Sequence, residues 1–156
     1  MKINLSQVPT ESGTNYPDEF KARVAGRRRQ RVGDAAGLKN VGVNLTTLEP
    51  GSQSALRHWH SAQDEFVYIL QGEVVMVTNA GEQTLHAGDM AGFAAGVENG
   101  HHLINRSDTP VLYLEVGDRT APDRVEYPDD NLFFALTENG QRRFARTDGR
   151  AYKRGR

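Results

Sequence analysis

The sequence predicts an all-β fold for its central part, residues 41–118 of 156. Short runs rich in β-branched and aromatic residues recur there at intervals of roughly 8 to 12 residues, a spacing typical of sandwiches and closed barrels. Gly, Pro, Asn and Asp separate the runs, as expected where antiparallel strands turn. No long stretch of this region keeps the apolar period of a helix, which argues against a parallel sheet with crossover helices.

The predicted strands follow one another along the chain. The first, over residues 42–48, alternates apolar and polar side chains and ends at Pro50-Gly51. The later ones are expected over residues 66–70, 73–78, 83–86, 90–93, 101–105 and 111–116. Each run has the length of a strand, so the region is expected to form one antiparallel sandwich or barrel.

Residues 1–40 lack a sustained period, contain Pro9 and Pro17, and are predicted to form an extended N-terminal arm. The arm carries the basic run RRRQR at residues 27–31. In a protein with balanced charge, such arginines are typically solvated or paired with carboxylates. Contact with phosphates or with the acidic edge of a partner is the alternative.

A C-terminal hairpin is predicted beyond the barrel, because the runs at 132–136 and 142–146 flank the turn signal Asn139-Gly140. The expected organisation is therefore an arm, a barrel core and a C-terminal hairpin with a basic tail. Their ranges are 1–40, 41–118 and 119–156. The hairpin is expected to pack on the barrel or on a dimer partner.

A homodimer is expected from the aromatic content of this hairpin. Phe133, Phe134 and Phe144 add more apolar surface than one small barrel can cover. The alternative is that these rings fold back on their own barrel.

Composition limits the chemistry that is open to the chain. With no cysteine, a bound metal must rest on nitrogen and oxygen ligands. Nineteen basic and twenty acidic residues give a net charge of −1, which provides no general attraction to nucleic acid or to an acidic membrane. A small-molecule ligand is the expected partner. A cytoplasmic location is expected, because the N-terminus lacks the apolar run of a signal peptide and no stretch has the length of a membrane span.

His58, His60 and Glu65 form the most informative pattern in the chain. In an extended strand alternate side chains share a face, so His58 and His60 can converge on one ion while Trp59 points away. Residues 61–64 have the length and composition of a hairpin loop, which is predicted to lay Glu65 beside His60 on the next strand. The pattern predicts a metal site, and a surface hairpin with scattered polar residues is the alternative.

The stretch around these residues resembles the first conserved motif of the cupin superfamily, which is Gly, HxH, four residues, Glu, six residues and Gly. It reads GSQSALRHWHSAQDEFVYILQG over residues 51–72. Residues 88–105 are similar to the second motif, a glycine, then Pro-x-Gly, then a histidine followed after three residues by an asparagine. Ala94 stands where that motif usually has proline. The resemblance implies a double-stranded β-helix, a jelly-roll barrel with a ligand cavity between its two sheets.

The second motif implies a fourth ligand, for which His101 and His102 compete because neighbours in a strand face opposite ways. The spacing to Asn105 favours His101. The expected ligand set is then His58, His60, Glu65 and His101. Three imidazoles and a carboxylate suit one divalent transition metal, Zn, Fe, Mn, Ni or Cu, better than calcium or magnesium. Six-coordination would leave two positions open to a ligand, and a closed structural zinc site is the alternative.

The whole chain looks like the small single-domain cupins often provisionally described as sugar-phosphate isomerases. This implies a metal-dependent enzyme that acts on a small polar metabolite such as a sugar or sugar phosphate. The alternatives are a metal-dependent dioxygenase and a non-catalytic binding or sensor module, because a fold does not define a function. No catalytic residue is assigned beyond the metal ligands. Side chains that could line the cavity are Tyr68, Met76, His86, Phe93, His102 and Asn105, although core packing or surface roles are expected for them.

Overall fold

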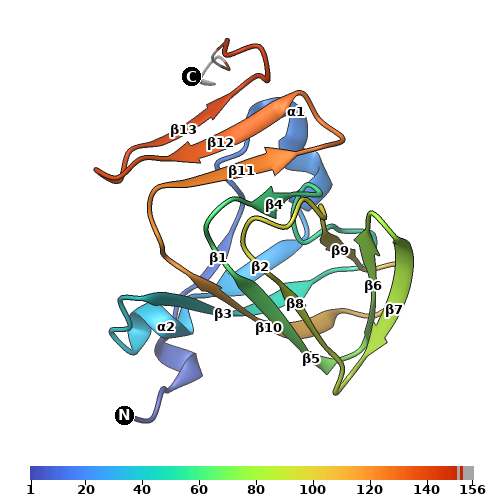
Figure 1. The fold of residues 1–156 in the computed structure, drawn as a ribbon. Coiled ribbons are helices and arrows are strands. Elements are labelled where there is room, and N and C mark those ends of the chain that lie inside the picture. Colours follow the sequence, from blue (N-terminus) through green and yellow to red (C-terminus); the bar gives the residue numbers. More distant parts are fainter. Residues whose placement is uncertain (151, 153–156) are drawn as a thin grey trace.

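The computed structural model describes residues 1–150 and 152, and its largest sheet has six antiparallel strands (Figure 1). These are β1 (Thr10–Ser12), β2 (Arg27–Gln30), β3 (Val41–Leu48), β5 (Glu65–Gln71), β8 (Met90–Phe93) and β10 (Val111–Asp118). They are ordered β1-β2-β3-β10-β5-β8 across the sheet. Residues 151 and 153–156 of the predicted basic tail lie outside the described residues.

Two smaller sheets complete the described structure. One, of order β7-β6-β9, contains β6 (Glu73–Thr78), β7 (Gly81–His86) and β9 (His102–Ile104). The other, of order β13-β12-β11-β4, contains β4 (Trp59–His60), β11 (Asp123–Tyr127), β12 (Leu132–Leu136) and β13 (Arg142–Ala145). Figure 1 shows β11, β12 and β13 at the top of the molecule, with β4 below them next to the barrel. The predicted all-β jelly-roll barrel is confirmed.

The N-terminal segment differs from the extended arm expected for it. It contains β1 and β2 and four short helical elements: η1 (Leu5–Gln7), α1 (Asp18–Lys21), η2 (Ala22–Val24) and α2 (Val32–Ala35). β2 pairs with β3 from Arg27↔Leu48 to Gln30↔Leu45 and so extends the main sheet. β2 could not be predicted from the sequence, because its arginines give no alternation of apolar and polar residues. Among the described residues, no helix has the length and apolar character needed to cross a lipid bilayer.

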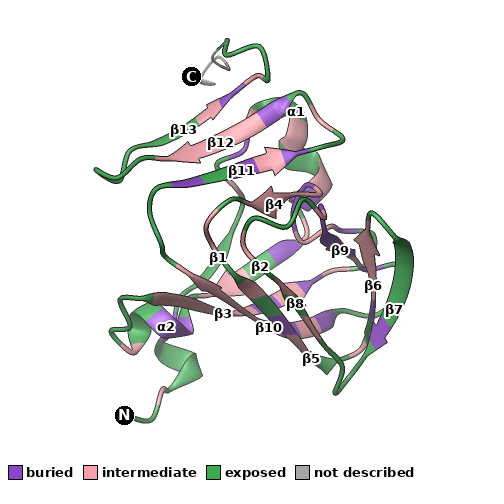
Figure 2. Ribbon diagram, viewed as in Figure 1, coloured by how far each residue is buried: buried purple, intermediate pink, exposed green. Residues whose placement is uncertain are grey.

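Two apolar clusters form the core. The barrel cluster comprises Leu48, Val67, Ile69, Val74, Leu85, Leu103, Val111 and Tyr113. The upper cluster lies between the four-stranded sheet and the N-terminal segment and comprises Tyr16, Val24, Leu56, Val125, Tyr127 and Leu132. Figure 2 shows buried residues along β9 and β10, whereas β7 is mostly exposed. Val67 and Ile69 of β5 are buried in the barrel cluster, on the same face of the strand as Glu65.

The predicted C-terminal hairpin is present as β12 and β13, and β11 joins it to β4. Phe134 and Phe144 lie with ring centroids 4.9 Å apart and pack against the upper cluster. The guanidinium of Arg124 covers the ring of Phe133 at 3.8 Å from its centroid. These rings are therefore covered by their own chain, which removes the reason given for a homodimer. The homodimer itself stays a prediction.

Candidate metal centre

The four expected ligands come from three places in the chain that the fold brings together. His58 immediately precedes β4 and His60 ends it, Glu65 begins β5, and His101 immediately precedes β9. His58 and His101 form an antiparallel bridge in which the amide of His58 donates to the His101 carbonyl at 3.1 Å and the amide of His101 donates back at 2.8 Å. Paired backbones of this kind place both imidazoles next to each other.

The side chains converge on one carboxylate oxygen. Oε2 of Glu65 lies 3.4 Å from Nε2 of His58, 3.6 Å from Nε2 of His60 and 2.9 Å from Nε2 of His101. Nitrogen and oxygen ligands sit about 2.0–2.2 Å from a zinc-like ion, so neighbouring ligands around one ion are about 3 to 3.5 Å apart. The observed spacing therefore fits a single ion held by these residues. His58, His60 and Glu65 alone already bring one ligand atom each within 4.8 Å of the others.

The predicted hairpin between His60 and Glu65 is wrong, although the two side chains do meet. β4 pairs with β11 in one sheet, while β5 pairs with β8 and β10 in another. Residues 61–64 cross between the sheets, held by hydrogen bonds from the Ala62 amide to Asp123 and from the Asp64 amide to Asp118. His60 and Glu65 thus face each other across the barrel interior instead of along one sheet.

Hydrogen bonds fix the orientation of the first two imidazoles. Nδ1 of His58 lies 2.8 Å from the carbonyl of Leu56, and Nδ1 of His60 lies 2.7 Å from Oδ2 of Asp123. Carbonyl and carboxylate oxygens only accept, so both Nδ1 atoms carry the proton. In the neutral rings the lone pair is then on Nε2, the atom that faces Glu65. This is the arrangement that typically prepares a histidine for a metal.

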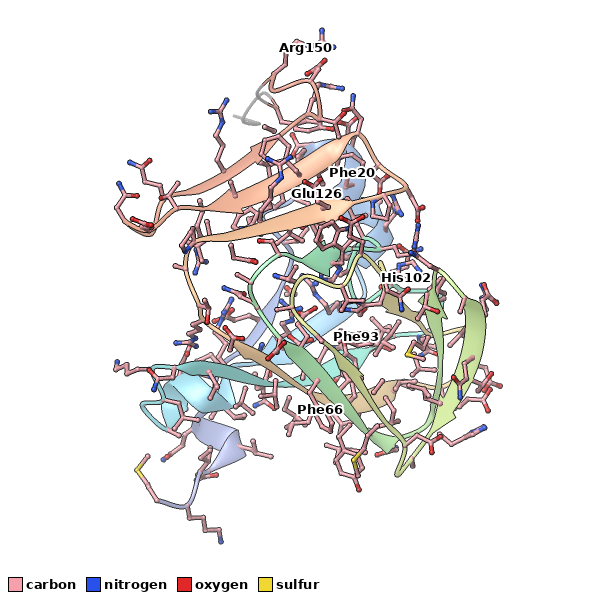
Figure 3. The ribbon with its side chains drawn as sticks, in the orientation of Figure 1. Phe20, Phe66, Phe93, His102, Glu126 and Arg150 are labelled. Carbon is pink, nitrogen blue, oxygen red and sulfur yellow. The ribbon has the colours of Figure 1, made fainter. Side chains whose placement is uncertain are left out.

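His101 and His102 lie on opposite sides of the strand, as expected for neighbours. The ring of His101 stacks on Phe93, with centroids 3.5 Å apart and planes 2° apart, while its Nε2 reaches Glu65. Its Nδ1 has no hydrogen-bond partner among the described residues. Nδ1 of His102 donates instead to the carbonyl of Ala55 at 3.2 Å. The geometry thus brings His101, and not His102, to His58, His60 and Glu65. Figure 3 shows Phe93, on which His101 stacks, in the interior of the molecule.

Electrostatics within the cluster favour an ionised carboxylate and act in opposite directions on the imidazoles of His101 and His60. Burial would raise the pKa of Glu65, but its interactions with the imidazoles of His58, His101 and His60 hold it well below its usual range. Burial lowers the pKa of His101 and outweighs the hydrogen bond to Glu65. Burial would also lower the pKa of His60, yet its bond to Asp123 and the charge of Glu65 raise it. One anion faced by three nitrogen atoms is a suitable donor set for a divalent cation.

The cluster opens onto a cavity of about 560 Å³ between the main sheet and the four-stranded sheet. Across the main sheet, Glu65 pairs with Phe93 on one side and with Gly117 on the other, and Gly117 pairs with Gly42. Both glycines line the cavity. Because Gly117 and Gly42 have no side chains, the cavity floor on their side of Glu65 stays open to a ligand.

The part of the cavity beyond the ligands contains residues that the sequence did not single out. Asp123, which orients His60, comes from β11, and Tyr16 and Tyr127 come from the upper cluster. The ring of Tyr127 stacks on His58 with centroids 5.8 Å apart. Burial raises the pKa of Tyr127 well above its usual value, and the charge of Glu65 raises it further while that of Arg27 lowers it. No local sequence signal marks these residues, because each reaches the site from a separate strand or loop.

Of the six side chains considered for the cavity wall, Phe93 and His102 line it. Asn105 has the structural role that was expected of it. It is fully buried and its amide nitrogen donates to the carbonyls of Leu48 and Thr109, each at 2.8 Å. His86 is exposed on β7.

Comparisons with known proteins agree with this architecture. The family model described as a cupin domain matches residues 44–117. The chain is similar to the crystal structure of a sugar phosphate isomerase from a cupin superfamily from Silicibacter pomeroyi, with a TM-score of 0.93 and 40% identity over 98% of this chain and 97% of that one. The chain belongs to the cupin superfamily.

Two other solved structures resemble it less closely. A protein from Acidithiobacillus ferrooxidans, provisionally described as a sugar phosphate isomerase, matches with a TM-score of 0.73 and 27% identity over 83% of this cupin and 81% of that chain. A predicted oxalate decarboxylase from Thermotoga maritima shares the fold, with a TM-score of 0.58 and 22% identity over 77% of this cupin and 100% of that chain. Among curated proteins, none matches the sequence. The family and the His58, His60 and Glu65 cluster together indicate a divalent metal.

Proposed function

We propose that this cupin is a metal-dependent isomerase that acts on a small polar metabolite, a sugar or a sugar phosphate. The observation that carries the proposal is the convergence of three imidazole nitrogens on one carboxylate oxygen at the wall of a cavity of about 560 Å³. The description of the Silicibacter pomeroyi protein as a sugar phosphate isomerase supports the choice of reaction, because the similarity extends over almost the whole of both chains.

His58, His60, Glu65 and His101 are the residues proposed to hold the metal. Zinc, iron, manganese, nickel and copper all accept such nitrogen and oxygen ligands. A divalent metal bound there would supply a Lewis acid that polarises a carbonyl oxygen of the substrate.

The other residues of the chain prepare the site for that chemistry. Asp123 holds the ring of His60 in one orientation, and the stacked ring of Phe93 does the same for His101. Tyr127 lines the cavity beside His58, and burial together with the neighbouring Tyr16 raises its pKa, so it presents a neutral hydroxyl there. Glu115 also lines the cavity, but it accepts a hydrogen bond from Asn44 at 2.9 Å and pairs with Arg29 at 2.8 Å. We therefore assign it no proton transfer.

The test combines metal analysis with a turnover screen. The purified protein is analysed for bound metal, then incubated with aldose and ketose phosphates and the matching free sugars while NMR follows their interconversion. We expect close to one metal ion per chain and isomerisation that chelation removes. His60→Ala should lose both, whereas His86→Ala, a change on exposed β7, should keep both.

Two outcomes would contradict the proposal. Ligand binding without turnover of any sugar or sugar phosphate would favour the binding or sensor module. Metal content that His60→Ala leaves unchanged would show that the ion does not use this cluster.

A further inference from the structure

The basic run on β2 alternates between the two faces of the main sheet. Arg27 pairs with Leu48 and Arg29 with Thr46, and both of these β3 residues are fully buried, so the two arginines share the inner face. Arg28 lies on the opposite face, where it forms an ion pair with Glu49. Of the three arginines, only Arg27 and Arg29 line the cavity.

Arg27 is a buried cation without a paired anion. Its residue is 6% exposed, and one of its guanidinium nitrogens donates to the carbonyl of Ser54. No described carboxylate lies within salt-bridge distance of Arg27, whereas Glu115, the carboxylate on the same face, is already bound to Arg29 at 2.8 Å. Burial lowers the pKa of Arg27, and the charge of Arg29 adds to that effect. A buried charge of this kind is costly unless something pairs with it.

The position of Arg27 connects it to the metal centre through the cavity. Arg27, its partner Ser54 and His58 line the same cavity. Four residues span at most about 14 Å of chain, so Ser54 and His58 lie within that distance of each other. Tyr113 also lines the cavity and is paired with Thr46 across β10 and β3. Neither of these two buried hydroxyls has a hydrogen-bond partner among the described residues. A short ligand in this cavity could thus contact the imidazoles and also a cation and a hydroxyl.

We propose that Arg27 binds an oxyanion of the cavity's ligand, a phosphate or carboxylate group, while the other end of that ligand faces His58, His60, Glu65 and His101. The inference rests on the proposed function in that it takes the cavity to be the substrate site. It adds the requirement that the ligand is anionic at one end. A guanidinium is suited to this role because its planar donors match two oxygens of a phosphate or carboxylate.

Calorimetry of ligand binding to the full-length protein tests the proposal. The protein is used both as purified and after chelation of its metal. The probes are inorganic phosphate, fructose 6-phosphate, fructose as the uncharged counterpart, and gluconate as the carboxylate. We expect fructose 6-phosphate or gluconate to bind at least tenfold more tightly than fructose. Whichever of these two anions has the higher affinity shows whether the bound group is a phosphate or a carboxylate.

Three variants assign this preference to Arg27. Arg27→Met should weaken binding of the preferred anion at least tenfold, and Arg27→Lys should bind with intermediate affinity, because lysine keeps the charge but loses the fork of donors. Arg28→Met removes the same charge from the neighbouring outward position and should change affinity less than twofold. The melting temperature of ligand-free Arg27→Met should stay equal or rise, because an unpaired buried charge is removed.

The results separate this inference from the proposed function. Arg27-dependent anion binding without isomerisation would leave the inference standing and contradict the isomerase. Isomerisation that Arg27→Met and Arg27→Lys both leave unchanged would overturn the inference. It would also be overturned by equal affinities for fructose and both anions, or by an Arg27→Met protein that unfolds while Arg27→Lys binds like the unmodified protein.

Discussion

The backbones of His58 and His101 form both hydrogen bonds of an antiparallel pair, although His58 belongs to the first cupin motif and His101 to the second. This pairing joins the two motifs through the backbone. The positions of both imidazoles therefore depend on strand geometry more than on side-chain flexibility. It also decides which of the two adjacent histidines faces Glu65, because the residue after a paired His101 must point the other way.

The ligand set can be tested by metal content. His101→Ala should lose most of the metal that the unmodified protein binds, because it removes a nitrogen 2.9 Å from Glu65 Oε2. His102→Ala should retain it, since that ring is turned to the carbonyl of Ala55. Plasma emission spectrometry on dialysed protein measures both. The reverse pattern would mean that His102 is the ligand.

Asp123→Asn should weaken metal binding about 10- to 100-fold without removing a ligand. The amide that replaces the carboxylate accepts less strongly from Nδ1 of His60 and no longer balances its charge. Competition with a chromophoric chelator gives the affinity. Asp129→Asn is the matched control, because Asp129 pairs with Arg57 at the surface. Equal affinities in the two variants would show that Asp123 serves only the fold.

Gly117→Ala should impair ligand binding while the fold is kept. A Cβ at this position would meet only ordinary contacts, 3.6 Å from the Asp64 carbonyl and 3.8 Å from Cγ of Glu65. The free energy of unfolding should stay the same or rise by up to about 1 kcal/mol, because alanine restricts the unfolded chain. The new methyl group occupies the cavity floor beside the metal centre. Unchanged affinity for every cavity ligand would place the ligand elsewhere.

Asn105→Ala should destabilise the protein by about 2 to 4 kcal/mol, because two buried carbonyls lose their donor. Those carbonyls belong to Leu48 and Thr109. Metal content of the folded variant should not change. Urea unfolding measures the first effect and metal analysis the second. Loss of metal from folded protein would instead assign Asn105 to the site.

A homodimer is the remaining prediction, and light scattering at micromolar concentration measures it. Because Phe134 and Phe144 pack within their own chain, the prediction now depends on surfaces other than this hairpin. A species of 17.3 kDa, the mass of one chain, would show that the protein is a monomer.

Local patterns were sufficient to predict the strands of the barrel and to mark residues that meet at the candidate metal centre. The alternation along 42–48, the β-branched and aromatic run at 66–70 and the turn signal at Asn139-Gly140 each act within a few residues. They can therefore be recognised without knowing what packs against them. The shared face of His58 and His60 is likewise a local property of an extended chain. The same holds for the opposite directions of His101 and His102.

Strand pairing and the far wall of the cavity depended on contacts between distant parts of the chain. Residues 61–64 could have formed a hairpin, but β4 instead pairs with β11 and Asp123 holds the crossing. Arg27 lies in the interior because β2 pairs with β3. β2 has no apolar alternation from which this pairing could be predicted. Each of these outcomes depends on which surfaces are buried together in the folded chain. The free energy gained by burying two surfaces against each other is not a property of either segment alone.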